Sequence, residues 1–391
     1  MKTTQLDYRR SHNRVTIARM KSWALEHLPR LNAKALTGDL SYRQMAIVLN
    51  DALLSRTPRV ATLSDEEALQ MLVILGIIGS SVERHAQQQF IKQESAGEGA
   101  DFSDRVAMST PGKGLAALYV NQTIPFLSYF QHVADIVGHP HRDSFMTLND
   151  FNGPSVEVRH PITGQPIYTL PALFNDGRFL TYSDNVSEVN FYGLIKQTLA
   201  LQIVANQYIE YLQQPTTALD SREAIEAILM ATYLIWAVKA KIIDFMNHKT
   251  FEIDFFLDVF RQYACQWYAD RYLKPPSGAN DAAALLRDVI LFDNLVPPFD
   301  GFPGFRGHVQ EVCTVLLPEH RKQLNTAMGL ASVEARIFTH LGISKADFAE
   351  LDGPSLSTIV QDSPWLLAYC CSRQFCPRRS PVPGCVQANS P

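Results

Sequence analysis

Long uninterrupted runs of apolar residues are missing from this chain of 391 residues. No stretch of about 18 such residues occurs, which is the length that a membrane-spanning helix requires. The first ten residues, from Met1 to Arg10, also lack the apolar centre of a secretory signal. We therefore expect a cytoplasmic protein that has no membrane partner.

An excess of charge of one sign is likewise absent. The formal net charge is −4, and the sequence pI is about 6.3. Nucleic acids and acidic membrane surfaces attract proteins with a strong positive field, which this chain lacks. Because 46% of the residues are hydrophobic and 19% are charged, the chain can bury a large core in one or two domains. A small molecule is the expected partner, and the sequence does not indicate an oligomeric state.

Several catalytic signatures do not occur in the sequence. It has no G-x-S-x-G elbow, no G-x-x-x-x-G-K-[ST] loop, no G-x-G-x-x-G and no H-E-x-x-H. Serine hydrolases, nucleotide-binding enzymes and zinc proteases are therefore disfavoured. Paired C-x2-C knuckles are also missing, although cysteines crowd the end of the chain at Cys370, Cys371, Cys376 and Cys385. Because prolines interleave these cysteines, we predict a disordered tail at 372–391 rather than a zinc site.

Apolar residues recur with the i, i+3, i+4, i+7 spacing of helices over most of the chain. The long segment after Asn185, a predicted N-cap, is expected to be a central and largely buried helix. Glu83, Arg84 and His85 are assigned to the polar face at the end of their helix. We predict an all-α fold with helices at 15–29, 64–93, 114–138, 187–213, 221–247, 253–272, 280–292, 306–327, 330–342 and 355–371.

One segment departs from the helical pattern. Between Ser155 and Tyr182, short β-type runs alternate with turns at 161–164 and 175–178. We predict a short β-hairpin excursion near 155–182 between two helical parts. The expected division is a smaller N-terminal helical layer at 1–150, a linker with hairpins at 151–186, a larger C-terminal helical bundle at 187–371 and the tail.

The predicted helix at 253–272 carries one cation among apolar residues. On a helix, Phe256, Phe260 and Tyr263 share a strip that should face the core. Arg261 is the only charged residue of the neighbouring strip. A guanidinium held among apolar neighbours needs an anion, because an unpaired buried charge costs several kcal/mol. That anion is either an external ligand or a carboxylate of the chain, unless Arg261 is a surface residue whose stem covers apolar side chains.

Two further segments carry groups suited to ligand binding. Ser277, Gly278 and Ala279 precede the predicted helix at 280–292, where small residues let the backbone approach a flat ligand and free N–H groups suit a carboxylate. A capped turn without a ligand is the alternative. His320 lies in another predicted helix, and a neutral imidazole can ligate iron, although most single histidines are not ligands.

The order of these elements resembles a known family. Phe255-Phe256-x3-Phe260-Arg261 is followed by Ser277-Gly278-Ala279-Asn280 and then by Leu317-Pro318-x-His320-Arg321. This succession is similar to that of the indoleamine 2,3-dioxygenase-like haem proteins, including the monodechloroaminopyrrolnitrin synthases, over roughly residues 70–345. The resemblance implies an all-helical bundle that binds b-type haem and uses O2 to oxidise a tryptophan-like or other aromatic amino acid.

The resemblance also implies roles for individual residues. Arg261 would hold the substrate carboxylate, and Phe256 and Phe191 would contact its indole ring. Ser277, Gly278 and Ala279 would line the pocket near the haem. An arginine makes charge-assisted hydrogen bonds to a carboxylate, and aromatic walls supply stacking.

The iron ligand is the position at which this chain departs from the family. The proximal histidine of the family lies on a later helix, and no histidine follows His340 here. His320 is therefore our first candidate for the iron ligand. A cysteine of the tail in that role, or a chain that has lost haem, are the alternatives.

Three functions remain open from the sequence. The first is a haem-dependent oxygenase of aromatic amino acids, for example in secondary metabolism. The second is a haem-free binding or accessory protein that keeps the pocket, and the third is a structural helical protein in which the motifs coincide by chance. The oxygenase predicts a Soret band after haem supply. The haem-free protein predicts only a melting-temperature shift with aromatic ligands, and the structural protein predicts no response to them.

Overall fold

The computed structural model describes residues 2–54, 56–94, 124–247, 251–265, 267, 276, 278–292, 296–300, 302–350 and 355. Within these residues the chain is predominantly helical and contains one small two-stranded antiparallel sheet. The predicted helical class is therefore confirmed. Whether the bundle is that of the indoleamine 2,3-dioxygenase-like proteins stays a prediction.

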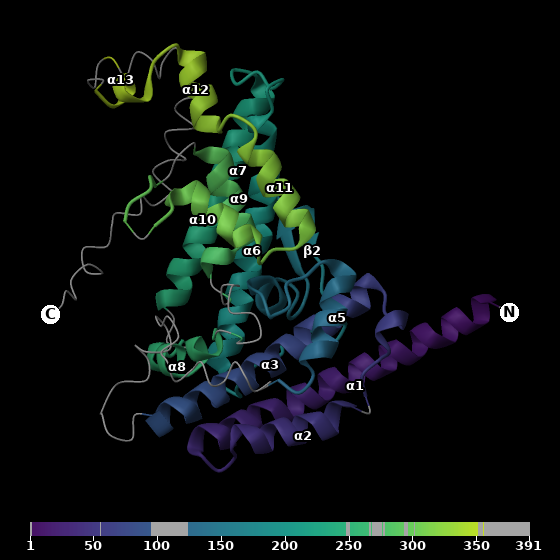
Figure 1. Ribbon diagram of the computed structural model, residues 1–391. Helices are drawn as coiled ribbons and strands as arrows, with labels where there is room; N and C mark the ends of the chain where they lie inside the picture. Colours follow the sequence, from purple (N-terminus) through teal and green to yellow (C-terminus); the bar gives the residue numbers. More distant parts are fainter. Residues whose placement is uncertain are drawn as a thin grey trace.

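The N-terminal part forms a layer of helices (Figure 1). In this layer α1 (Lys2–Thr37) and α2 (Tyr42–Leu54) pack on α3 (Asp65–Glu94), and α5 (Leu127–Val137) packs on another side of α3. The segment from Met71 to Ile78 is apolar and buried on all sides. A helix that is apolar all round must be enclosed, which explains why α3 lies at the centre of this layer.

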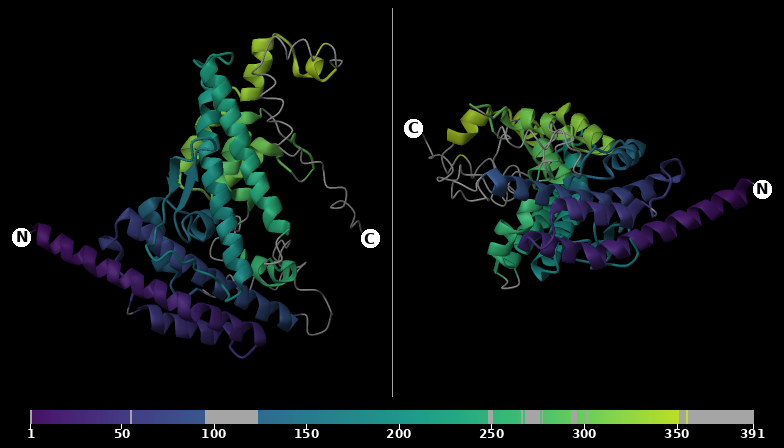
Figure 2. Two further views of the ribbon diagram at one scale, coloured as in Figure 1. Left: turned by 180° about the vertical axis from the view of Figure 1, so that it is seen from behind. Right: turned by 60° about the horizontal axis from the view of Figure 1, so that its bottom comes forward.

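Two long helices, α6 (Val186–Gln213) and α7 (Arg222–Asn247), rise from this layer side by side (Figures 1 and 2). The side chain of Asn185 accepts a hydrogen bond from the backbone N–H of Ser187 and so caps the start of α6. The predicted N-cap and the predicted burial of this helix are therefore confirmed, since Tyr192, Lys196 and most of its later residues are buried or half-buried.

The C-terminal helices cover α6. They are α9 (Ala282–Leu291), α10 (Gly304–Cys313), α11 (Pro318–Met328), α12 (Val333–Leu341) and α13 (Lys345–Glu350). Here α9 packs on α6, and α11 packs on α9. The carboxylate of Asp281 caps α9 by accepting from the N–H groups of Ala283 and Ala284.

The sheet is a single hairpin of β1 (Val156–Arg159) and β2 (Pro166–Leu170), with Val158 opposite Tyr168. Gly164 supplies a positive φ in the connecting turn. The inward residues Val158 and Leu170 join the core around α6. The hairpin predicted within 155–182 is confirmed, and the predicted turn near 175–178 lies in a segment without strands.

Two hydrophobic cores divide the described residues. One is built from α1, α2, α3 and α5, and the other from α6, α7 and the C-terminal helices. Tyr263 and Trp267 belong to the first core although they come late in the sequence. The division of the chain into domains at about 150 and 186 stays a prediction, and the tail at 372–391 lies outside the described residues.

Two predicted helices are wrong in extent. The helix predicted at 253–272 ends early, as α8 (Ile253–Asp258) followed by a 3-10 turn, η4 (Phe260–Tyr263). The side-chain amide of Gln262 donates to the carbonyl of Leu257 over 2.9 Å, so it satisfies an acceptor that a longer helix would have used. The helix predicted at 306–327 is two helices, because Pro318 lacks an N–H and starts α11.

The remaining differences are smaller. We did not predict α2, and α1 extends well beyond the predicted segment at 15–29. Of the helix predicted at 114–138, α5 confirms the part from Leu127 onward, residues 124–126 form a turn, and residues 114–123 lie outside the described ones. In the part of the chain that the structure describes, no helix is both long enough and apolar enough to cross a membrane.

Candidate functional site

A cluster of phenylalanine rings lies where the beginning of α6 meets α8. The ring centroid of Phe191 lies 5.1 Å from that of Phe256 and 5.3 Å from that of Phe260. Phe251 lies 6.3 Å from Phe191, and Phe245 of α7 lies 4.7 Å from Phe251. We call these five residues the aromatic cluster. It brings together Phe191 and Phe256, which the resemblance had assigned to one pocket.

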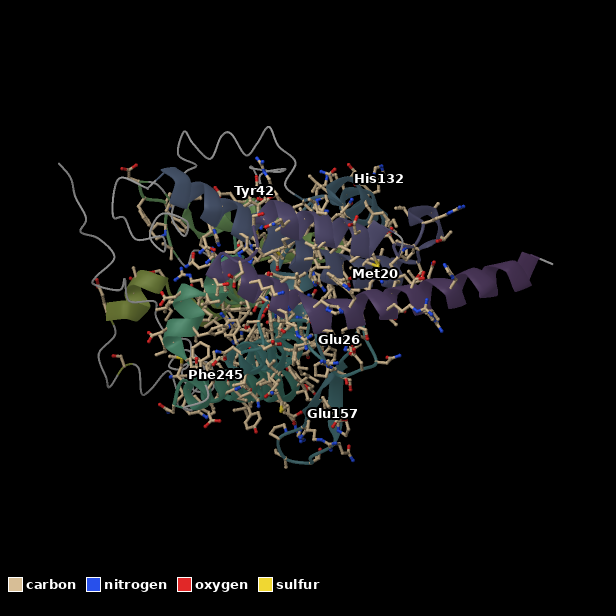
Figure 3. All side chains as sticks on the ribbon, turned by 90° about the horizontal axis from the view of Figure 1, so that it is seen from below. Met20, Glu26, Tyr42, His132, Glu157 and Phe245 are labelled. Atoms are coloured by element: carbon tan, nitrogen blue, oxygen red, sulfur yellow. The ribbon has the colours of Figure 1, made fainter. Side chains whose placement is uncertain are left out.

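The aromatic cluster is open to solvent on its outer side. Each of its rings is only half-buried, and the neighbouring side chains of Met246, Ile253 and Leu257 are 60%, 56% and 42% exposed. In Figure 3, the cluster residue Phe245 lies on the opposite side of the molecule from His132 of α5. A contiguous exposed apolar area of this kind commonly marks a binding surface.

Arg261 follows the cluster residue Phe260, and its side chain is exposed. Of the alternatives left open for Arg261, the surface residue is confirmed, and the expected buried guanidinium is not. The reason is the end of α8 at Asp258, which removes the helical strip on which that expectation rested. An exposed cation beside aromatic rings can still meet the carboxylate of a ligand, so the substrate-binding role of Arg261 stays a prediction.

The small-residue loop offers less to a ligand than we expected. Ser277 lies outside the described residues, whereas Gly278 and Ala279 belong to a short 3-10 turn, η6 (Gly278–Asn280), before α9. A Cβ added to Gly278 would meet no atom within 4 Å, so the turn does not require a glycine for close packing. Asp281 already occupies two N–H groups at the start of α9, which are therefore not free for a carboxylate.

His320 lies in the first turn of α11. Its ring is half-buried, and its Nδ1 is a buried atom without a hydrogen-bond partner in the part of the chain that the structure describes. Burial lowers the pKa of this histidine, so the imidazole is neutral at neutral pH. In the same turn, Pro318 packs against Gly138, where an added Cβ would come within 2.7 Å of the proline ring.

His320 and the aromatic cluster are not brought together. Figure 1 shows α8 at the lower end of α6 and α11 beside its upper part. A neutral imidazole is suited to haem iron, but a ligating histidine usually has its second ring nitrogen held by a hydrogen bond, which Nδ1 lacks. His320 therefore supplies the imidazole expected for haem iron. It does not lie beside the phenylalanine rings that would contact the substrate, as the resemblance implies.

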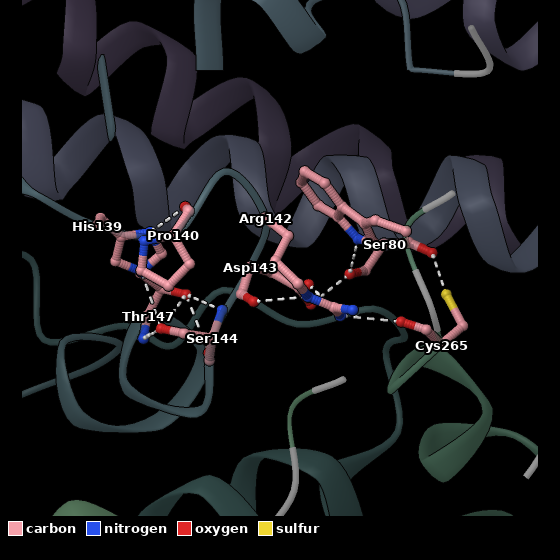
Figure 4. A network of polar contacts seen from close by, with 9 residues as sticks. Ser80, His139, Pro140, Arg142, Asp143, Ser144, Thr147 and Cys265 are labelled. Atoms are coloured by element: carbon pink, nitrogen blue, oxygen red, sulfur yellow. Dashed lines mark hydrogen bonds and ion pairs between the residues drawn. The ribbon is translucent and has the colours of Figure 1, made fainter. Parts of the chain in front are cut away.

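A buried polar network surrounds Arg142 and Asp143 (Figure 4) and was not predicted from the sequence. Arg142 and Asp143 form an ion pair of 2.7 Å with both side chains fully buried. The carboxylate of Asp143 also accepts from the hydroxyl of Ser80 over 2.6 Å, and Arg142 donates to the carbonyl of Cys265 over 3.0 Å. Each charge of the pair is thus compensated by further hydrogen bonds, as burial requires.

The same network fixes the segment that follows Tyr263. The indole N–H of Trp267 donates to the hydroxyl of Ser80 over 3.0 Å. The ring lies so close to α3 that a Cβ at Gly79 would come within 2.5 Å of it. Because Trp267 and Cys265 are anchored in this way, the turn that carries Phe260 and Tyr263 is held against the N-terminal layer.

The polar residues 83–85 of α3 are the clearest correction to the sequence analysis. Glu83, Arg84 and His85 are only 1–2% exposed, although we had assigned them to a solvated face. The guanidinium of Arg84 lies 5.8 Å from the ring centre of Tyr263, and the ring of His85 meets Tyr263 edge-on at 5.9 Å. Arg84 and His85 lie inside because η4 packs against the second half of α3.

Tyrosine hydroxyls gather between the network and the aromatic cluster. Tyr182, Tyr192 and Tyr263 are each 1–2% exposed, and their hydroxyl oxygens have no hydrogen-bond partner among the described residues. We call these three residues the tyrosine cluster. An unsatisfied buried polar group costs about 1–3 kcal/mol, so three of them within one group of packed rings are unusual.

The tyrosine cluster is continuous with the aromatic cluster. The ring of Phe260 lies 6.2 Å from that of Tyr182 and 5.5 Å from that of Tyr192. Tyr182 in turn stacks on Tyr263, with 4.1 Å between centroids and an angle of 6° between planes. Aromatic rings therefore lead without interruption from the surface at Phe245 to the buried hydroxyls.

Comparison with known proteins does not add to this description, because neither a scan against protein-family models nor a search of curated proteins found a match. Within the described ranges, no group of three or more His, Cys, Asp or Glu residues could hold a metal ion. The half-buried rings of the aromatic cluster are suited to binding a flat aromatic group. The one signal that could have indicated the buried part was the i, i+4 spacing of Glu188, Tyr192 and Lys196 along a helix predicted to be buried.

Proposed function

We propose that this protein binds a small aromatic molecule at the aromatic cluster. The observation that carries the proposal is the gathering of Phe191, Phe256 and Phe260 from separate segments, with their rings tilted and only half-buried. Tilted rings with centroids 5–6 Å apart are in the favourable edge-to-face range. A flat ligand placed against them would bury apolar surface that is now in contact with water.

The proposal keeps the ligand class that the resemblance suggests, an aromatic amino acid or a related acid. Small-molecule sites are mostly apolar and contain a few polar groups that fix the orientation of the ligand. Here the cluster supplies the apolar walls. Two polar groups adjoin it at Phe260. Arg261 follows Phe260 in the chain and is exposed, and the rings of Tyr182 and Tyr192 contact Phe260 on the buried side.

Calorimetric titration of the full chain with L-tryptophan and indole-3-propionate tests this function. We expect binding that raises the melting temperature, and a loss of affinity of about 3–10-fold in Phe256→Leu, which keeps apolar volume but removes a ring. Tyr233→Ala, an exposed aromatic residue of α7 outside the cluster, is the matched control. Failure of the wild-type chain to bind any indole compound would contradict the proposal.

A haem-dependent oxygenase of aromatic amino acids is the second candidate. The observation that favours it is the neutral, half-buried imidazole of His320. Haem iron, when bound, would supply the activation of O2. The separation of His320 from the aromatic cluster counts against this candidate.

Reconstitution with haem, followed by absorption spectroscopy, decides on the second candidate. A Soret band in the wild-type protein that is lost or shifted in His320→Ala would support it. His340→Ala, which alters an exposed histidine on α12, is the control. Protein that binds indole compounds but gives no Soret band would support the binding function and contradict the oxygenase function.

A further inference from the structure

The tyrosine cluster is an unexplained feature of the interior. Tyr182 comes from the loop before α6, Tyr192 from α6 and Tyr263 from η4. Three separate segments thus contribute buried hydroxyls without partners to one connected group of aromatic rings. Burial raises the pKa of all three phenols, so each hydroxyl keeps its proton and can donate a hydrogen bond.

The carboxyl groups of Asp143 and Glu188, which act electrostatically on these hydroxyls, are already in use. Both Asp143 and Glu188 act electrostatically on Tyr182 and Tyr192, and Glu188 also acts on Tyr263. Asp143 accepts from Arg142 and Ser80. Glu188 accepts from the backbone N–H of Tyr182 and from the backbone and hydroxyl of Ser183. Neither carboxylate accepts from a tyrosine, so the three donors lack an acceptor within the described part of the protein.

Acceptors from outside the chain would complete this arrangement. The aromatic cluster lies next to the tyrosine cluster through Phe260, and a ligand ring held by the cluster would bring its substituent toward the hydroxyls. A carboxylate is suited to them, because its two oxygens accept about four hydrogen bonds and donate none. An ammonium group can only donate to the hydroxyl oxygens, so the hydroxyl protons would still lack an acceptor.

Building on the binding function proposed above, we propose that the ligand is an aromatic carboxylic acid whose carboxylate is held by the hydroxyls of Tyr182, Tyr192 and Tyr263. The acid thus enters with its carboxylate toward the interior, and the exposed Arg261 does not hold it. These tyrosines are then the residues that select acids over amines. Hydrogen bonds to a charged group are stronger than those between neutral groups, so each hydroxyl has a measurable share in affinity.

Titration of single tyrosine variants with two matched compounds tests the proposal. Indole-3-propionate has the carboxylate and no ammonium, and tryptamine has the ammonium and no carboxylate. We expect the full-length wild type to prefer indole-3-propionate, and Tyr182→Phe, Tyr192→Phe and Tyr263→Phe each to weaken its binding by about 10-fold. Tryptamine binding should not change. Tyr211→Phe, at the exposed far end of α6, is the control.

A second readout does not depend on any ligand. Because the three hydroxyls have no partner in the described protein, their removal should leave the melting temperature of the free protein unchanged or higher. A fall of several degrees would show that a hydroxyl serves the fold, and would overturn its assignment to the ligand. Equal affinity of wild type and tyrosine variants for indole-3-propionate, or a loss of affinity only in Arg261→Gln, would also overturn the proposal while leaving the binding function intact. A wild type that binds neither compound would overturn both.

Discussion

Two neighbouring groups of buried polar residues differ in one respect. In the network around Arg142 and Asp143, the charges and the Trp267 indole all have hydrogen-bond partners. In the tyrosine cluster, hydroxyls that are equally buried have none among the described residues. A satisfied network is explained by the fold it holds together, whereas unsatisfied donors need another explanation. The difference separates structural residues from candidate ligand-binding residues within one core.

The largest expected effect comes from breaking the satisfied network. Asp143→Asn removes the negative partner of a fully buried arginine, and we expect it to lower the free energy of unfolding by about 3–5 kcal/mol. Chemical denaturation measures this change. Glu226→Gln, which alters the exposed pair of Arg222 and Glu226 on α7, is the control and should have no measurable effect. Equal stability of the two variants would contradict a structural role for the network.

The second effect is a change of stability with pH, which we expect from the titration of Glu188. Burial raises the pKa of Glu188 to about 8 from its ordinary value of 4.5. The folded state therefore holds this proton more tightly than the unfolded state, and stability is lost as the pH rises from about 4.5 through 8. We expect wild type to lose roughly 3 kcal/mol over this range relative to Glu188→Gln.

Comparison with Glu188→Gln is needed because the titration of His139 changes the stability with pH in the opposite direction. Burial lowers the pKa of His139 to about 4, so its contribution is lost as the pH falls below 6.5. This contribution is the same in wild type and variant, and it cancels in their difference. Parallel stability curves for the two proteins between pH 5 and 8 would show that Glu188 is ionised in the folded state throughout.

A smaller effect should follow from filling the space between α3 and Trp267. Gly79→Ala would place a Cβ within 2.5 Å of the indole ring, and overpacking of this kind typically costs about 1–3 kcal/mol. The melting temperature of Gly79→Ala measures this cost. Gly193→Ala on α6, where an added Cβ meets no atom within 4 Å, should be neutral or stabilising. A loss in Gly193→Ala as large as in Gly79→Ala would contradict the close seat of Trp267.

The overall helical fold could be predicted from the sequence because apolar periodicity reports directly on which helices face a core. It placed α3, α6 and α7 within a residue or two, and the turn at 161–164 predicted the hairpin. The end of α8 could not be predicted, since no glycine or proline marks it and the capping interaction comes from the side chain of Gln262.

The candidate site could be predicted only in part. Phe191 and Phe256 were identified through the resemblance, and their contact is present. The buried polar residues escaped prediction because periodicity assigns polar residues to the surface. Arg84 and Asp143 are inside because other segments cover them, and such long-range contacts leave no local pattern. The exposure of Arg261 was left open for the same reason, since it depends on where α8 ends.

The smallest expected effect is that of Arg261→Gln. Its side chain is exposed, so we expect no change in stability and no change in affinity for indole-3-propionate if the carboxylate lies inside. Titration beside Tyr192→Phe makes the contrast between the outer cation and the inner hydroxyls direct. A large loss of affinity in Arg261→Gln alone would return the carboxylate to the position that the sequence suggested.

A crystal structure of the full chain with indole-3-propionate tests the central claim most directly. We predict that the indole ring lies against Phe191, Phe256 and Phe260, and that its carboxylate oxygens lie within about 3 Å of the tyrosine hydroxyls. A ligand whose carboxylate rests on Arg261, with the hydroxyls of Tyr182, Tyr192 and Tyr263 still lacking partners, would contradict the claim. So would hydroxyls that bind only ordered water while the ligand lies elsewhere.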